Sequence, residues 1–307
     1  MDKKQRYFHF ITQCLLVLLS LNISLFAKSN EAFYNDYVYL TPLSINTFSE
    51  SLPLDIFQNP ALLSLQESSS IALNIAEETW DYQEIFLCGS WNHPSIKIGY
   101  SVAQELSDQI PETSAPTPLD KPQILNYKKH KTHQISLTGI FTQFLFNPTI
   151  KISYLKQQLM HEQAQSFQID LAAFHQFNSR LSLSAFTRYL NSAPLKWKSS
   201  QLKETRQPEL ILESAYQFEK FRARISSNAT WMKLALSQQY HQLHFFIEYA
   251  TKFKKENNRN HLQRLSFGSQ LKWRTIDIFY YYHYYPHSQL KAKKSQLSFI
   301  WRWPLLT

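Results

Sequence analysis

Apolar and polar residues alternate along most of the chain after residue 69. Within 165–177, for example, Phe167, Ile169 and Leu171 are separated by polar or small residues. Because successive side chains of a strand point to opposite faces, this period of two predicts strands with one apolar and one more polar face. Many segments are about 9–12 residues long, whereas strands of soluble proteins usually have about 5–6 and a tilted strand needs about 9–11 to cross a bilayer. The pattern therefore predicts an all-β fold of membrane-crossing strands.

The spacing of these segments predicts about 14 strands. Their ranges are 69–77, 83–91, 95–103, 133–145, 149–158, 165–177, 180–190, 208–218, 221–227, 230–238, 242–252, 262–273, 275–285 and 295–303. Every second connection is short, and several of the intervening connections are long and polar, the longest being the predicted loop 104–132. Outer-membrane barrels have short periplasmic turns, long outer loops and an even number of strands. We therefore predict one antiparallel transmembrane β-barrel over residues 69–307.

Aromatic residues lie near many of the predicted strand ends. They are Trp91, Trp231, Trp273, Tyr189, Tyr216, Tyr249, Tyr284 and Tyr285. Trp and Tyr concentrate at the two interfaces of a membrane, where an apolar ring with a polar edge meets both lipid and water. We interpret this set as two interfacial girdles, with an ordinary aromatic core as the alternative. The last predicted strand also alternates in the manner of outer-membrane barrels, with Leu297, Phe299, Trp301 and Trp303 on one face.

The N-terminus has the form of an export signal. Lys3, Lys4 and Arg6 precede an apolar run over 8–26, which ends at Ala27. A basic start, an apolar stretch and a small residue at the end are typical of a cleaved signal peptide. We predict cleavage after residue 27 and export to the outer membrane, with an uncleaved membrane anchor as the alternative.

Composition excludes several classes of enzyme. The chain of 307 residues has only 4 Gly, and they are isolated, so neither a dinucleotide-binding fingerprint nor a phosphate-binding loop can be formed. Its 2 Cys exclude a disulfide framework. Histidines three apart point to opposite faces of a strand, which argues against a metal site. We expect no catalytic residue, no metal and no cofactor. The net charge of +9 would suit nucleic acid, but an exported chain rarely meets it. Anionic lipid headgroups or lipopolysaccharide phosphates are more natural partners of the basic loops, and we favour plain solvated loops over either.

A short motif precedes the first predicted strand. The segment 55–63 contains Asn59-Pro60-Ala61. It resembles the Asn-Pro-Ala segment of the long-chain fatty-acid transporter (FadL-like) barrels and of the PorV-like barrels. The resemblance implies a barrel whose N-terminal segment, here 28–68, enters the lumen, and it implies binding or passage of a hydrophobic molecule. The low glycine content departs from these families.

If the apolar faces of the strands meet lipid, the polar faces line the lumen. The lumen would then contain Asp170, Arg188, Glu213, Arg222, Arg224, His244, Glu248, Arg264, Lys272, Asp277 and His283. Around the turn 219–220, Glu213 comes within reach of Arg224, and around Arg274 the carboxylate of Asp277 comes close to Lys272. Because buried charges need partners, a paired structural network and a substrate pathway are both open interpretations.

These inferences converge on a non-enzymatic outer-membrane barrel that binds or passes a hydrophobic solute. The candidate substrate and lumen residues are Asn59, Pro60, Ala61, Asp170, Arg188, Glu213, Arg222, Arg224, Glu248, Arg264 and Asp277. The expected partners are outer-membrane lipid and a hydrophobic small molecule, without nucleic acid, and no protein partner can be named. Two alternatives remain: a PorV-like docking or assembly factor that acts through loop 104–132, and a soluble secreted β protein that binds a ligand or a partner.

Overall fold

The barrel and a short segment before it are described by a computed structural model. It describes residue 56 and residues 59–78, 82–93, 96–113, 124–141, 146–159, 162–192, 194–198, 203–205, 208–228, 231–252, 263–284 and 293–303. The signal peptide predicted for residues 1–27 lies outside the described residues. The described part of the chain contains no helix that is both long and apolar enough to cross a membrane.

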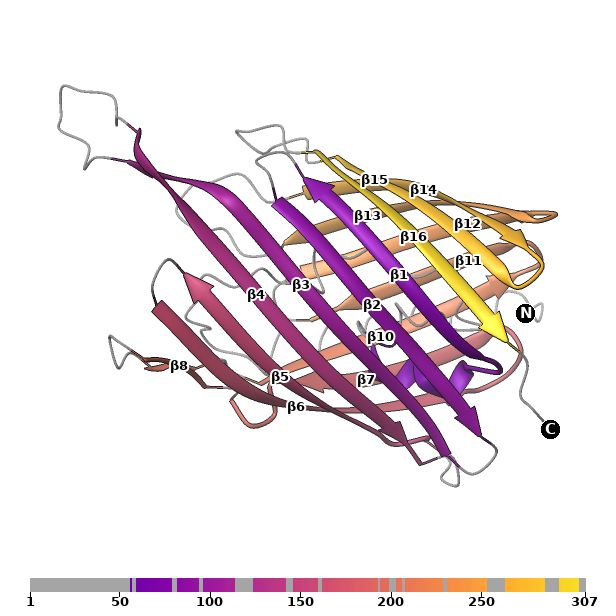
Figure 1. The fold of residues 1–307 in the computed structure, drawn as a ribbon. Coiled ribbons are helices and arrows are strands. Elements are labelled where there is room, and N and C mark those ends of the chain that lie inside the picture. Colours follow the sequence, from indigo (N-terminus) through magenta and orange to yellow (C-terminus); the bar gives the residue numbers. More distant parts are fainter. Residues whose placement is uncertain are drawn as a thin grey trace.

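Fourteen of the sixteen strands in these ranges form one closed antiparallel barrel (Figure 1). They are β1 (Ser69–Glu78), β2 (Tyr82–His93), β3 (Ile96–Thr113), β4 (Ile124–Ile140), β5 (Thr149–Leu159), β6 (Glu162–Gln176), β7 (Leu181–Arg188), β10 (Glu209–Phe218), β11 (Phe221–Ser227), β12 (Trp231–Tyr240), β13 (Leu243–Lys252), β14 (Gln263–Trp273), β15 (Ile276–Tyr284) and β16 (Lys293–Trp303). The remaining two, β8 (Leu195–Trp197) and β9 (Lys203–Glu204), add to β6 beside the barrel wall.

Closure depends on the pairing of the first strand with the last. Along β1 and β16 the register runs from Ser69 opposite Trp303 to Glu78 opposite Lys294. Every other wall strand pairs with its neighbour in the chain, and β7 pairs with β10 across the β8–β9 insertion. Within the described residues the wall is therefore continuous, which leaves no edge strand with unpaired backbone groups.

Burial follows the predicted alternation of the two faces. On β5, Lys151 and Ser153 are buried toward the lumen, whereas Ile152 and Tyr154 are exposed on the outer face. The same pattern recurs around the wall, so the outer surface carries large exposed apolar side chains on most strands. A soluble monomer rarely exposes so continuous an apolar surface, whereas a barrel in a bilayer requires one. On β16 the four predicted residues, Leu297, Phe299, Trp301 and Trp303, all lie on this outer face.

The prediction of a loop over 104–132 is wrong for most of these residues. There β3 continues to Thr113 and β4 begins at Ile124, so the two strands form a long hairpin that extends beyond its neighbours (Figure 1). At the other end β4 stops at Ile140, earlier than predicted. The apolar alternation fades in this hairpin, which is why the pattern suggested a loop. Backbone pairing between β3 and β4 maintains the strands there, with register shifts at Ser107/Ile110 and Glu112/Thr113.

Two members of the predicted aromatic girdles are buried instead of lying on the outer face. Trp231 is fully buried and Tyr189 is 6% exposed, whereas Trp91, Trp273 and Tyr249 lie exposed on the outer face. Position near a strand end does not reveal the face on which a side chain lies. The girdle interpretation therefore holds for the outward members only, and Tyr285 lies outside the described residues.

The short turns use non-glycine residues with positive φ. Asn147, Glu219, His241 and Arg274 have φ values between 41° and 55°. In this left-handed region the Cβ of an L-residue approaches the next carbonyl oxygen, which costs roughly 1–2 kcal/mol per residue. Because the chain has only 4 Gly, other residues occupy these strained positions. The tight turns they form place adjacent wall strands in register.

The turn between β10 and β11 can be tested directly. We expect Glu219→Val to lower the free energy of unfolding by about 1–2 kcal/mol, because a β-branched side chain is strained at positive φ. The matched control is Lys220→Val, the other residue of the turn, which is not among the positive-φ residues. Urea unfolding in phosphatidylcholine vesicles, followed by tryptophan fluorescence, measures both. Equal losses for the two variants would contradict the assigned strain.

Candidate functional site

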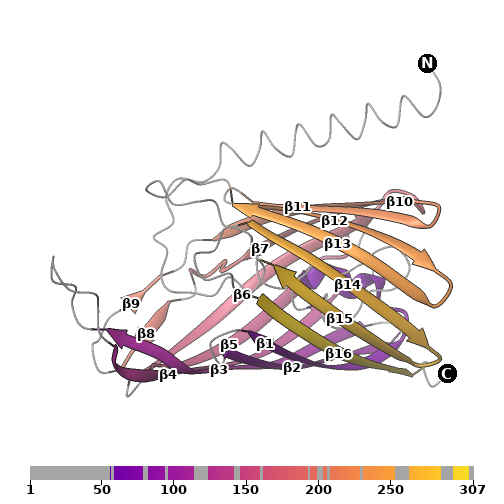
Figure 2. The ribbon, with the colours of Figure 1, turned by 90° about the horizontal axis from the view of Figure 1, so that it is seen from above.

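A short helix lies inside the barrel and follows the Asn-Pro-Ala motif. The 3-10 helix η1 (Pro60–Leu65) lies in the lumen near the end of the barrel at which β1 begins (Figures 1 and 2). Its first turn is specified locally: the Asn59 side chain accepts a hydrogen bond from the Ala61 amide at 3.1 Å, and Pro60 occupies the first helical position. Asn is a favoured cap and Pro a favoured first residue of a helix. We refer to Asn59 and η1 together as the plug.

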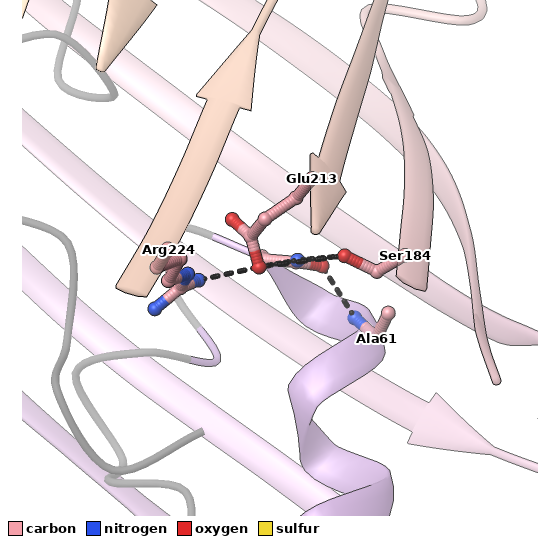
Figure 3. Close-up of polar contacts among 5 residues, drawn as sticks. Ala61, Ser184, Glu213 and Arg224 are labelled. Atoms are coloured by element: carbon pink, nitrogen blue, oxygen red, sulfur yellow. Dashed lines mark hydrogen bonds and ion pairs between the residues drawn. The ribbon is translucent and has the colours of Figure 1, made fainter. Parts of the chain in front are cut away.

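The N-terminal end of the plug is anchored to β7, β10 and β11. The Asn59 amide nitrogen donates to the Ser184 hydroxyl at 2.8 Å and to a Glu213 carboxylate oxygen at 3.0 Å. The same oxygen accepts a hydrogen bond from the Arg224 guanidinium at 2.6 Å (Figure 3). All of these groups are buried, so each hydrogen bond replaces contact with water inside the lumen. One carboxylate thus links the plug to a cation on the wall.

The C-terminal end of the plug is anchored to β2 and β3. The Lys97 ammonium donates to the carbonyl oxygens of Ser64 at 2.8 Å and Gln66 at 2.6 Å. The Asn92 amide donates to the Gln66 carbonyl at 2.9 Å. Carbonyls at the end of a helix lack partners within the helix, and a cation suits them. Because β4, β5 and β6 separate these strands from β7, the plug joins two distant parts of the wall.

Apolar side chains of the plug add a second kind of contact. Leu62 and Ala61 pack in a buried group with wall residues, and Leu63 packs with Ile56 and Ile140. The wall residues of the first group are Ala172, Phe174, Phe186, Ile211, Trp231 and Ala250. Burying a leucine side chain stabilises by roughly 1.5–3 kcal/mol. The plug is therefore held by packing between its polar ends, in the lumen position that the resemblance implied.

Every predicted wall residue of the site faces the lumen. Buried or half-buried there are Asp170, Arg188, Glu213, Arg222, Arg224, Glu248, Arg264 and Asp277. Of these, Glu213 contacts the motif residue Asn59, and Arg224 is linked to the motif through Glu213.

Acids and bases form separate pairs on the inner wall. Arg264 pairs with Glu248 of the adjacent strand, and Asp277 pairs with Arg302 of β16. Asp277 also lies opposite Lys272 in the register of β14 and β15, as predicted. Asp170 accepts hydrogen bonds from the Gln168 amide and from the Tyr189 backbone amide. The paired interpretation therefore accounts for most of the predicted charges.

The sequence analysis did not predict an apolar group of side chains inside the lumen. We call it the aromatic cluster; its members are Ala72, Phe86, Cys88, Ala103, Phe246, Phe279, Tyr281 and Ile300. The ring centroids of Phe246 and Tyr281 are 4.5 Å apart, and those of Phe279 and Tyr281 are 6.1 Å apart. The Phe246 ring lies over Gly268, where an added Cβ would meet the ring at 1.9 Å. Close approach of the ring therefore requires glycine at this position.

A signal for the aromatic cluster was present in the sequence. The runs Phe245-Phe246-Ile247 and Tyr280-Tyr281-Tyr282 have no polar residue between apolar ones. On a strand, such a run makes both faces apolar, so one of its residues must face the lumen. The expectation of a polar inner face therefore fails at Phe246 and Tyr281.

Together the closed wall, apolar outer face and internal plug define a transmembrane β-barrel of the plugged kind. No protein-family model matches the sequence, and no curated protein matches it. Solved structures do match the fold, among them a Pseudomonas aeruginosa FadL homologue with TM-score 0.53 and 10% identity, covering 83% of this chain and 95% of that one.

Two toluene transporters have a similar fold. The Ralstonia pickettii transporter TbuX has TM-score 0.52 and 9% identity, with 82% of this chain and 94% of that chain covered. The Pseudomonas putida transporter TodX has TM-score 0.50 and 10% identity over the same shares. At such low identity the likeness concerns the fold alone. This similarity of fold confirms the resemblance to FadL-like barrels that Asn59-Pro60-Ala61 suggested.

The buried pair of Glu213 and Arg224 yields a stability prediction. We expect Arg224→Met to lower the free energy of unfolding by about 3–5 kcal/mol, because a buried carboxylate loses its cation. Removing both charges in Glu213→Gln/Arg224→Met should recover most of this loss. Urea unfolding in lipid vesicles measures both, with the exposed Lys220→Ala as the neutral control. If the double variant were as unstable as the single one, the carboxylate would not be the cause.

Proposed function

We propose that the protein is a non-enzymatic outer-membrane barrel that binds or passes a hydrophobic solute. The observation that carries the proposal is the aromatic cluster, a group of buried apolar and aromatic side chains on the inner wall that is separate from the apolar contacts of the plug. Sites for small apolar ligands are lined mainly by hydrophobic and aromatic side chains with a few polar groups around them. The rings of Phe246, Phe279 and Tyr281 meet this description, and paired charges such as Arg264 and Glu248 lie on the same inner wall.

The location supports the same function. The cluster draws on β1, β2, β3, β13, β15 and β16, which lie in one stretch of wall around the closure with β14 between β13 and β15. The plug is anchored to β2, β3, β7, β10 and β11. A solute can therefore meet an apolar wall beside the plug. The toluene transporters with a similar fold transport an apolar aromatic molecule, which is the chemical class that such a wall would favour.

The plug would restrict passage through the lumen. Its two anchored ends and packed leucines hold Asn59, Pro60 and Ala61 in place inside the barrel. Free flow of water and small polar solutes would dissipate the barrier that the membrane provides, and a resident plug limits it. In this proposal Asp170, Arg188, Glu213, Arg222, Arg224, Glu248, Arg264 and Asp277 keep the lumen wall rigid and polar around the solute path.

The apolar outer wall supports placement in the outer membrane and argues against a soluble secreted protein. A docking or assembly role is the second candidate, and the long β3–β4 hairpin favours it, because it extends beyond the rest of the barrel (Figure 1). A pure docking protein would bind no hydrophobic solute, so a binding measurement separates the two candidates.

Solute binding can be tested with two neighbouring residues on opposite faces of β15. We expect Phe279→Ala, which removes a buried ring of the aromatic cluster, to weaken binding of toluene or a fluorescent aromatic probe about tenfold, because roughly 1.5–3 kcal/mol of contact is lost. Tyr280→Ala is the matched control, since Tyr280 is 47% exposed on the outer face. Titration of the purified barrel in detergent measures both. Absence of binding by the unchanged protein, or equal weakening in both variants, would count against the proposal.

A permeability measurement tests whether the plug restricts passage through the lumen. We expect Asn59→Ala combined with Lys97→Met to raise the entry of a small sugar into proteoliposomes severalfold, because contacts at both ends of the plug are removed. Liposome swelling measures the rate, and Lys220→Ala serves as control because Lys220 lies on an exposed turn. An unchanged swelling rate in a variant that remains folded would mean that the plug does not limit passage.

A further inference from the structure

An open groove hollows the outer face of the wall across β10, β11, β12 and β13, which are consecutive in the barrel (Figure 2). Its volume is about 390 Å³, and its lining is mainly apolar. Ala223 of β11 lies between two larger side chains in the strand registers, with Tyr216 opposite it on β10 and Leu236 opposite it on β12. All three line the groove. Because the side chain of alanine is a single methyl group, Ala223 forms the floor of the hollow.

A polar side chain lies among the outward rings of this groove. Gln238 of β12 is exposed on the outer face, directly opposite Phe221 of β11 and Phe245 of β13. Both rings are also exposed on that face. Within the described residues the Gln238 side-chain amide has no hydrogen-bond partner. An amide in contact with hydrocarbon is unfavourable unless it is hydrogen-bonded, so its partner must come from outside the protein.

The depth of Gln238 indicates which partner is within reach. Strand β12 ends at Tyr240, three residues or fewer from the short turn, and Tyr240 is 61% exposed on the outer face, as expected at a membrane interface. A strand tilted by about 35–45° rises roughly 2.5 Å per residue along the membrane normal, which places the Gln238 amide roughly 5–8 Å from the turn. The headgroup region of a leaflet is roughly 5–8 Å thick. The amide therefore lies at the boundary between headgroups and hydrocarbon, which is the level of the ester carbonyls of a phospholipid.

We propose that this groove binds one glycerophospholipid of the leaflet at the short-turn end of the barrel. One acyl chain fills the hollow over Ala223, and the Gln238 amide donates a hydrogen bond to an ester carbonyl oxygen. In a membrane orientation with short turns inside, this is the periplasmic leaflet.

Two features separate this groove from the rest of the lipid-facing wall. It combines a hollow, where a chain makes contacts on several sides, with a hydrogen-bond donor at the depth of the ester group. It is also independent of the hydrophobic-solute proposal, because Ala223 and Gln238 lie outside the aromatic cluster and on the opposite face of the wall.

Native mass spectrometry of the full-length barrel, released from a nonionic detergent, tests the site. The protein is titrated with palmitoyl-oleoyl phosphatidylethanolamine and separately with its dialkyl ether analogue, which lacks the ester carbonyls. We expect a single ester lipid to bind per barrel, and the ether lipid to bind about fivefold more weakly, because one neutral hydrogen bond is lost. In Gln238→Leu the two lipids should bind equally, at the weaker level. Ala223→Leu, which fills the hollow, should weaken binding of both lipids at least fivefold.

Matched controls make the same substitutions outside the groove. Gln83→Leu removes an exposed amide from β2 near the other end of the barrel, and Ala185→Leu enlarges a half-buried alanine of β7. Both controls should bind the ester lipid as the unchanged protein does.

The comparison of ester and ether lipids uses the unchanged protein, so it does not depend on the folding of any variant. Heat-modifiability on gels verifies that the variants are folded. Equal affinity of the unchanged barrel for the two lipids, undiminished binding in Ala223→Leu, or equal losses in the two controls would overturn the site. Displacement of the bound lipid by toluene would assign the groove to a hydrophobic solute and would also overturn it.

Discussion

The closing pair of β1 and β16 is the interaction on which the rest of the structure depends. Inside a bilayer no water is present to pair with backbone N–H and C=O groups, and each unpaired group costs several kcal/mol. Fourteen strands satisfy these groups only when the first and last strands meet, as they do from Ser69–Trp303 to Glu78–Lys294. Closure encloses a lumen, and every inward side chain must then find its partners inside that enclosed space.

The lumen meets this demand in three ways. Buried acids and bases pair across neighbouring strands, as Arg264 does with Glu248. The plug uses Glu213 and Lys97 of the wall to satisfy its own helix ends, so it is part of the barrel's hydrogen-bond network. Apolar side chains gather in the aromatic cluster instead of dispersing among the charges. The result is a wall with distinct polar and apolar regions, which a uniformly polar pore would lack.

Much of the wall could be predicted from the sequence because the strand period is local. Alternation placed Phe299 and Trp301 outward and Asp170 and Glu213 inward, and the turns at Glu219 and Arg274 followed from chain reversal. The prediction failed where alternation stopped. Strands β3 and β4 extend through the polar stretch to Thr113 and from Ile124, because cross-strand pairing maintains them without an apolar face.

The sequence by itself determined the face of the strand residues wherever apolar and polar residues alternate, and it determined that a capped turn begins at Asn59. Only the tertiary structure decided which inward residues meet. Asn59 reaches Ser184 and Glu213, 125 and 154 residues away, and the aromatic cluster collects side chains from six strands. A period of two specifies the face of a residue, but its depth and its neighbours around the wall depend on register and closure, which are properties of the whole barrel.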